Sequence, residues 1–339
     1  MNNQATAPKV MKETKNKIRV DFERTSFWTR FKLKYLSFKF VKTVVWVIFR
    51  FVLLVGISYV ILSPVLSKIF SSFMGKEDFV DVTVKYIAKY PTLDTYKALI
   101  VEAKYFTAFF NTLLLSLACA LIQTFICCVV AYGFAKFKFK FNNLLFFLVI
   151  FTMVVPHETL QLSLFMKFRY FDVFDIIKTF GGEQINLLNT YWPLIILSLG
   201  GLGFKNGLYI YMLRQYFRGV PDELEESAYL AGSGVFRTFV QIIIPLSVPM
   251  LITVFLFSFS WQWTDMFYSE LFFPKSSFIM MPDIIMIPKS LDTVYAGQSM
   301  YEAAIYNTGS LLIIAPLIIM YLFCQRYLIA GIERSGIVG

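Results

Sequence analysis

Long apolar segments follow one another along this chain of 339 residues, and short polar segments separate them. A helix of about 20 apolar residues is long enough to cross the roughly 30 Å of hydrocarbon in a bilayer. The pattern therefore predicts an all-α, polytopic membrane protein with six transmembrane helices. The six spans are expected at residues 42–72, 106–137, 143–168, 191–216, 244–268 and 303–327.

The composition agrees with a membrane protein, because 57% of the residues are hydrophobic and only 16% are charged. So few charges do not cover a soluble globule of this length. The net charge of +10 raises the possibility of a nucleic-acid partner. The basic residues, however, lie beside apolar spans and not among aromatic residues in a polar domain, so membrane lipid is the expected partner.

The distribution of Lys and Arg predicts the orientation of the spans. Six crossings place both termini on one side, and with the N-terminus inside, the inner segments carry 19 Lys and Arg against 10 in the outer loops. The positive-inside rule thus favours N-in and C-in. No signal-peptide pattern opens the chain, so we expect a basic cytoplasmic tail at residues 1–43. Residues 44–104 then form the first span and the first outer loop, 105–330 a core of five spans, and 331–339 a cytoplasmic C-terminal tail.

Sites for redox, metal or nucleotide chemistry are not indicated. The four cysteines lie inside apolar runs, where a thiol is more often a small packing group than a metal ligand. They are Cys119, Cys127, Cys128 and Cys324. No GxxxxGK[ST] phosphate loop occurs, and no segment is large enough for a catalytic domain, so we expect neither a catalytic residue nor a cofactor in this chain.

The polar segment VPDELEESAYLAGSGVFRTFVQIIIPLSVP, residues 220–249, separates the fourth and fifth expected spans. Leu224, Ala228 and Ala231 recur at helical spacing, so we predict a short amphipathic helix with Pro221 in its first turn. Four carboxylates near its start favour the positive end of the helix dipole. Gly232 is expected to end the helix, and Ser233 to cap a second helical piece that leads to Pro245. A solvated loop without a partner is the alternative.

The spacing of Glu226, Ala228, Gly232, Phe239, Ile242 and Pro245 resembles the EAA motif, E-A-A-x-x-x-G-x(9)-I-x-L-P, of the permease subunits of binding-protein-dependent ABC importers. In that family the loop is the coupling helix that docks in a cleft of the ATPase subunit. The resemblance implies a type I importer permease fold with a coupling helix between helices four and five. It also implies the ATPase-coupling residues Glu223, Glu225, Glu226, Ala228, Gly232, Phe239 and Pro245.

Further segments are similar to the maltose-type carbohydrate branch of that family, and the similarity covers residues 90–339. They are FNTLLLSLACALIQTFICCVVAYGFAKFKF, MVVPHETLQLSLF, YWPLIILSLG, LRQYFRGVPDELEESA and FCQRYLIAGIERSGIVG. Two positions of the loop depart from the motif. Ser227 stands where the first Ala is usual, and Ala231 replaces an Asp, so one polar contact or cap of the family is expected to be missing.

The resemblance implies a subunit of a sugar or oligosaccharide importer in the bacterial cytoplasmic membrane. The implied partners are a second homologous permease, two cytoplasmic ATPase subunits and an extracytoplasmic sugar-binding protein. ATP and Mg²⁺ would be bound by the ATPase subunits.

Ionisable and aromatic residues inside the expected spans are candidates for the translocation path. They are His157, Glu158, Lys205, Trp261, Trp263 and Asp265. His157 and Glu158 follow Pro156, so they either line the path or repair a proline break. Lys205 lies in the glycine-rich GGLGFKNG, where irregular backbone either packs against protein or lines a water-filled cavity. The two tryptophans stack on sugar rings or anchor the chain at the membrane interface.

Two other functions remain open on these residues. One is a secondary transporter driven by an ion gradient through Glu158, His157 and Lys205, which leaves the 220–249 segment unexplained. The other is a membrane-embedded enzyme with His157 and Glu158 as acid and base. A single histidine without a second cluster of catalytic or metal-ligand spacing disfavours that enzyme.

Overall fold

The computed structural model describes residues 10–12, 18–20, 38–173, 176–180, 182–203, 205–274, 278–292 and 297–336. The chain divides into two units, Met1–Leu66 and Ser67–Gly339, and each is described by itself. The expected tails at 1–43 and 331–339 lie largely outside the residues whose side chains are described.

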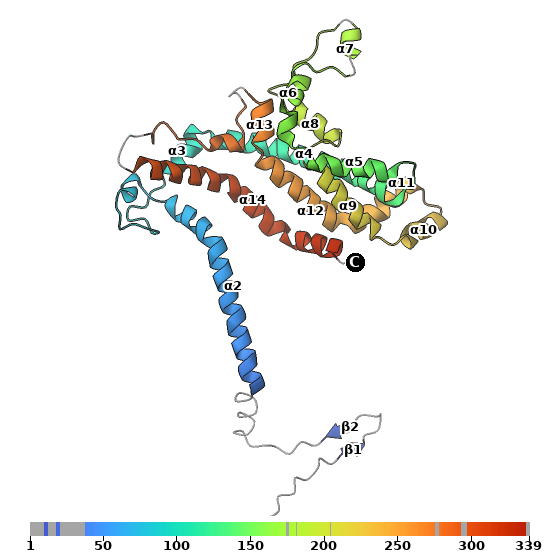
Figure 1. Cartoon of the computed structure of the whole chain (residues 1–339), viewed down its shortest axis with the longest axis horizontal. Coiled ribbons are helices and arrows are strands. Elements are labelled where there is room, and N and C mark those ends of the chain that lie inside the picture. The colour runs from blue at the N-terminus through green and yellow to red at the C-terminus, as the bar shows by residue number, and fades with distance from the viewer. Residues whose placement is uncertain are drawn as a thin grey trace, which may run out of the picture. The chain divides into compact units, whose positions relative to one another are not determined.

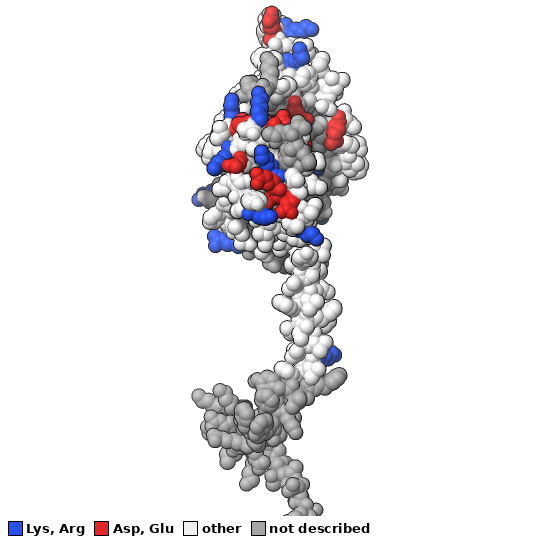
Figure 2. All heavy atoms as spheres, turned by 90° about the vertical axis from the view of Figure 1, so that its left-hand side faces the viewer, with Lys and Arg blue, Asp and Glu red and all other residues white. Residues whose placement is uncertain are grey.

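The first unit contains most of one long apolar helix. β1 (Val10–Lys12) and β2 (Ile18–Val20) pair antiparallel, with Val10 opposite Val20. α2 (Phe38–Ser71) follows and runs on into the second unit. Its spheres are almost entirely white in Figure 2. A helix that is apolar around its whole circumference is expected in lipid. The guanidinium of Arg50 lies 5.1 Å from the ring centre of Trp46, a cation–π distance.

The second unit is helical (Figure 1). Its elements in chain order are η1 (Lys76–Phe79), α3 (Asp94–Glu102), α4 (Tyr105–Lys136), α5 (Asn142–Val154), η2 (His157–Leu160), α6 (Gln161–Arg169), α7 (Ile176–Thr179), α8 (Trp192–Leu199), α9 (Asn206–Arg218), α10 (Glu223–Leu230), α11 (Val235–Thr238), the π-helical η3 (Phe239–Ile243), α12 (Ile244–Trp263), α13 (Phe267–Phe272), η4 (Met281–Ile284) and α14 (Gln298–Gly336). The expectation of a helical membrane protein is confirmed.

Four of the six expected spans are continuous helices, long and apolar enough to cross a membrane: Phe40–Ser71, Tyr105–Lys136, Val235–Trp263 and Gln298–Ile329. The other two contain Pro156 and the glycine-rich GGLGFKNG, and the described structure breaks both at these positions. The third bends by 95° between α5 and the η2–α6 segment. The fourth consists of α8 and α9, which are separated at residues 200–205.

Each break has a local cause. Pro156 has no N–H to donate to the helix, and the residue before it, Val155, is extended with ψ of 118°. The second break contains two residues in the left-handed region, Gly201 with φ of +70° and Lys205 with φ of +62°. Glycine adopts this conformation freely, whereas lysine is held there at a cost of about 1 kcal/mol.

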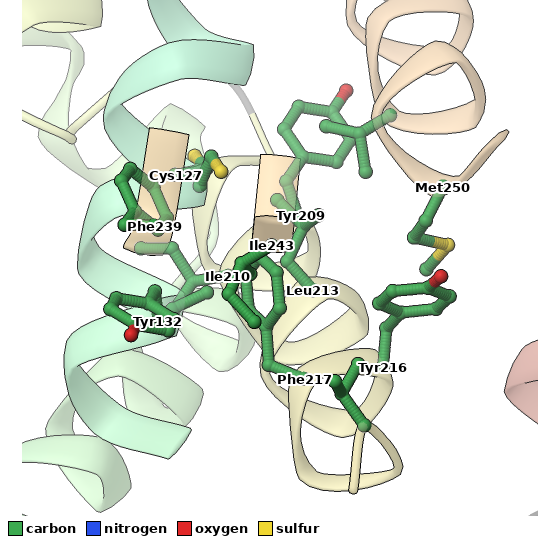
Figure 3. Packing of buried hydrophobic residues seen from close by; sticks show 14 residues of the cluster. Cys127, Tyr132, Tyr209, Ile210, Leu213, Tyr216, Phe217, Phe239, Ile243 and Met250 are labelled. Atoms are coloured by element: carbon green, nitrogen blue, oxygen red, sulfur yellow. The ribbon is translucent and has the colours of Figure 1, made fainter. Parts of the chain in front are cut away.

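α4 is the central helix of the second unit, because it packs against α8, α9 and α12. Its apolar contacts at one end include Tyr132, Tyr209, Phe217 and Ile243, which Figure 3 shows packed closely together. The expectation that the cysteines are packing residues is confirmed for α4, where Cys119, Cys127 and Cys128 are buried free thiols; Cys324 is a half-buried one.

Carboxylates hold the loop at residues 73–104 through hydrogen bonds from its backbone. The buried carboxylate of Asp78 accepts hydrogen bonds from the backbone N–H groups of Gly75, Lys89 and Tyr90. Asp81 accepts bonds from the side chain and backbone of Thr83, and these lower its pKa to about 2. Charged side chains of both signs gather on the end of this unit that carries α3 (Figure 2).

Candidate functional site

A cavity of about 750 Å³ lies where the two broken spans meet α12 and α13. The turn at Pro156 forms one wall and the turn from Gly201 to Lys205 another. Irregular backbone inside a membrane is tolerated where it lines a cavity or is buried in protein, and both breaks here satisfy that condition. Its polar and aromatic lining includes His157, Glu158, Lys205, Asn206, Trp261 and Tyr268.

Four of the six candidate path residues lie together in this cavity. His157 begins η2 directly after the Pro156 turn, and its Nδ1 shares a hydrogen bond of 3.1 Å with the Tyr268 hydroxyl. Lys205 precedes α9, and its Nζ lies 5.1 Å from the centre of the Trp261 ring, a cation–π distance. Trp261 is 45% exposed and contributes to the lining of the cavity.

The lining combines hydrogen-bond donors, an acceptor and an aromatic face. The Lys205 ammonium donates, the Glu158 carboxylate accepts, and His157 does either according to its tautomer. An aromatic ring such as that of Trp261 packs against the apolar C–H face of a sugar. This combination suits a ligand with many hydroxyl groups.

The other two candidates do not line the cavity. Trp263 is fully buried, donates its indole N–H to the Ile313 carbonyl at 2.9 Å, and packs edge-on against Phe109. Asp265 is only 7% exposed. Its carboxylate accepts the backbone N–H groups of Tyr268 and Ser269 at the start of α13. Both residues therefore have structural partners.

A buried polar layer supports the break between α8 and α9. Gln123 of α4 donates to Ser198 Oγ at 3.1 Å and accepts from Ser258 Oγ at 2.7 Å. A Cβ at Gly203 would lie only 2.7 Å from Gln123 Nε2. The close approach of the chain to this amide therefore requires glycine at that position.

The segment at residues 221–245 forms a helix with a glycine-based end, as predicted. α10 ends in a Schellman motif: Gly232, with φ of +83°, donates to the Tyr229 carbonyl, and Ser233 donates to the Ala228 carbonyl, each at 2.9 Å. The expectation that Ser233 caps the next helix is wrong, because Gly234 occupies the N-cap of α11 without a side-chain bond.

The buried face of α10 differs from the predicted one. Leu224 is 41% exposed and Ala231 is exposed, whereas Glu225 and Ala228 are buried. A carboxylate is buried only when a charge or hydrogen-bond donor compensates it. Lys136 supplies that charge, and the apolar spacing of the sequence does not reveal it.

Lys136, the last residue of α4, contacts the start of the loop. Its Nζ donates to the Val220 carbonyl at 2.7 Å and to the Asp222 carboxylate at 2.6 Å, and lies 3.7 Å from Glu225 Oε1. The hydrogen bond from Lys136, followed by its positive charge, lowers the pKa of Asp222 below the ordinary value.

The expected coupling residues divide between the two faces of this loop. Glu225, Ala228 and Phe239 face inward. The Phe239 ring lies beside that of Tyr132 (Figure 3), with 4.6 Å between the ring centres. The remaining four, Glu223, Glu226, Gly232 and Pro245, are exposed.

Two exposed apolar side chains were not among the expected residues. Leu230 is 91% exposed and Phe236 is 79% exposed, on either side of the Gly232 turn. Leu230 is an apolar residue that lies outside the predicted apolar stripe of α10. That position alone would have identified it from the sequence as an exposed apolar residue. Tyr268 of the cavity had no such signal, because it is one aromatic residue among many.

Residues 123–334 match the family described as "Binding-protein-dependent transport system inner membrane component". This chain belongs to that family. The match includes both the cavity and the 221–245 loop. Within the described residues, no group of three His, Cys, Asp or Glu side chains is placed to hold a metal ion.

Two curated relatives have names that state a transport substrate. The chain is 29% identical to the maltodextrin transport system permease protein MalD of Streptococcus pneumoniae over 287 residues, which cover 84% of this chain and 92% of the relative. It is 25% identical to the galactooligosaccharides transport system permease protein GanQ of Bacillus subtilis, over 86% of this chain and 95% of the relative.

One solved structure has the same fold. It is the crystal structure of a bacterial ABC transporter involved in the import of the acidic polysaccharide alginate. The TM-score is 0.64 with 18% identity, and the alignment covers 84% of this chain and 96% of the other. The chain thus shares the fold of this transporter, and the family match makes it a membrane component of a binding-protein-dependent transport system.

Proposed function

We propose that this permease forms half of the translocation path of an importer for neutral sugars or oligosaccharides in the bacterial cytoplasmic membrane, with N-in and C-in orientation. The family match supports the importer, and the names of the relatives support an oligosaccharide substrate. The observation that carries the substrate class is the cavity, whose lining combines the Trp261 ring with Lys205, Glu158 and His157.

In this proposal the sugar crosses the membrane through the cavity between the broken spans. The two breaks divide spans three and four into halves that are able to tilt separately. A second homologous permease supplies the other half of the path, and an extracytoplasmic binding protein delivers the sugar. Two cytoplasmic ATPase subunits bind ATP and Mg²⁺, so this chain carries no nucleotide site of its own.

The 221–245 loop docks the ATPase through its outward face. Leu230 and Phe236 supply exposed apolar contacts, and Glu223 and Glu226 supply the polar rim. Glu225, Ala228 and Phe239 act inside the subunit by holding the loop on the bundle. This division refines the set of coupling residues that the motif implies.

Uptake into proteoliposomes tests the importer and its substrate. The permease pair, the ATPases and the binding protein are reconstituted with ATP inside the vesicles, and uptake of labelled maltodextrins or galactooligosaccharides is measured. We expect saturable uptake that needs ATP and survives an ionophore. Trp261→Ala should reduce uptake about tenfold, the loss expected for one aromatic contact with substrate. Uptake that is abolished by the ionophore and indifferent to ATP would contradict the proposal.

Substitution of the exposed apolar residues tests the docking surface. Leu230→Ser and Phe236→Ser should each weaken ATPase association by about tenfold, because exposed apolar anchors of a docked helix contribute about 1–2 kcal/mol. Val82→Ser is the matched control, since Val82 is 90% exposed but lies in the 73–104 loop. If Leu230→Ser and Phe236→Ser both retained ATPase association, the ATPase would dock on another surface of the permease.

A further inference from the structure

Lys136 is buried at the end of α4, although it is a lysine in the last turn of a helix that leads into a polar loop. Its side chain is only 6% exposed. A lysine is seldom buried this far without partners. The partners here are the Val220 carbonyl and the Asp222 and Glu225 carboxylates, all in the segment from the end of α9 to the first turn of α10.

The electrostatics of α10 depend on this ammonium group. Glu225 Oε1 is buried and lies 3.7 Å from Lys136 Nζ, and the Tyr132 hydroxyl also interacts with this carboxylate. The positive charge of Lys136 therefore compensates the burial of Glu225. Without it, the first turn of α10 would have to rotate to expose the carboxylate to water.

The last two turns of α4 hold both ends of the loop. Lys136 bonds to its start, and Tyr132, one helical turn earlier, packs against Phe239 where the loop re-enters the bundle. Side chains four residues apart lie on one face of a helix. The loop is thus attached to a single face of α4 at two points.

We propose that Lys136 is a positioning residue that fixes the angle of α10 on α4 and transmits displacement of α10 to the bundle. The claim that Lys136 transmits displacement rests on the proposed function. The claim that Lys136 fixes the angle of α10 does not. Asp222 and Glu225 are the two anionic partners, and Asp222 accepts the shorter bond.

Spin labels measure the angle directly in the assembled complex. Labels at Ser227 on α10 and Asn143 on α5, both exposed, report the distance between the loop and the bundle. We expect one narrow distance distribution in the otherwise wild-type complex. Lys136→Met should at least double the width of the distance distribution. Lys136→Arg should bring the width most of the way back to the wild-type value, because arginine keeps the charge and the donors. Lys140→Met is the control, since Lys140 is an exposed lysine in the short segment between α4 and α5.

Uptake completes the test. ATP-driven uptake should fall roughly tenfold in Lys136→Met, as for the loss of one charge-assisted hydrogen bond, and should recover in Lys136→Arg. If Lys136→Met fails to assemble, the double variant with Glu225→Gln removes the uncompensated carboxylate, and we expect it to assemble with the wide distribution.

A narrow distribution and unchanged uptake in Lys136→Met would overturn the inference and leave the proposed function intact. A wild-type complex that does not import sugar with ATP would overturn the proposed function instead. In that case the label distances still decide whether Lys136 fixes the angle of α10.

Discussion

Gly232 offers a substitution whose cost comes from the backbone alone. Its φ of +83° lies in the left-handed region, where an L-residue costs about 1 kcal/mol or more. A Cβ built at this position meets no atom within 4 Å, so steric contact adds nothing. Gly232→Ala should therefore weaken the end of α10 by about 1 kcal/mol, which is about fivefold in the local opening equilibrium.

Gly234, two residues further on, is the matched control. A Cβ there also meets nothing within 4 Å, but the backbone is extended, with φ of −79° and ψ of 163°. Any residue adopts this conformation. Gly234→Ala should leave the folded loop unstrained and should stabilise it by up to about 1 kcal/mol through the unfolded chain.

Hydrogen exchange followed by mass spectrometry separates the two variants. The amides of Gly232 and Ser233 donate the two bonds of the Schellman motif, so their exchange reports its opening. We expect about fivefold faster exchange in Gly232→Ala, since 1 kcal/mol corresponds to that factor. No acceleration is expected in Gly234→Ala. Equal acceleration in both variants, or none in Gly232→Ala, would refute the argument from backbone conformation.

Two further substitutions test the buried polar layer and the first long loop. Gly203→Ala should destabilise the permease by about 1–3 kcal/mol, because the new Cβ displaces the doubly hydrogen-bonded Gln123 amide. The melting temperature of this variant should therefore fall. Gly133→Ala is the control, because a Cβ there meets nothing within 4 Å and the melting temperature should stay unchanged. The pKa of Asp81 is lowered from 3.8 to about 2, so its bonds to Thr83 are complete above pH 3.8 and are lost as the pH falls to about 2. Thr83→Ala should raise that pKa toward 3.8 in a carbon-13 NMR titration, and an unchanged pKa would contradict this assignment.

Much of the fold could be predicted from hydrophobicity and glycine positions. Each expected span corresponds to a helix or a pair of helices, because burial of apolar side chains in lipid acts along the whole segment. The end of α10 was also predictable, since a Schellman motif is a local structure that needs only Gly232 and the preceding turn.

The composition of the cavity could be predicted only in part. Trp261 and Trp263 were treated as equivalent, yet residues two apart point to different sides of a helix, so only one was able to face the cavity. Helical geometry alone would have separated them. The hydrogen bond between Tyr268 and His157 depends on the packing of α13 against α6 and η2, which the local sequence does not encode.

The same limit applies to α10, where hydrophobic spacing predicted the wrong buried face. Such spacing assumes that carboxylates stay in water. Glu225 breaks that assumption because Lys136, distant in sequence, compensates its charge. Long-range ion pairs are therefore the point at which the prediction of this loop fails.

α4 provides a direct route between the loop and the cavity wall. It is a continuous helix of 32 residues, with Lys136 at one end, and with Gln123, about 20 Å away along the axis, bonded to Ser198 beside the α8–α9 break. A continuous helix moves as a rigid body, whereas the two broken spans bend at their turns. If α10 is displaced by an ATPase, the displacement reaches the polar layer around Gln123 through α4. The breaks around the cavity are then the positions at which the helices bend. A chain of contacts alone does not establish coupling. Coupling also needs an element able to take up two arrangements, and the breaks at residues 155–157 and 200–205 are the candidates for it.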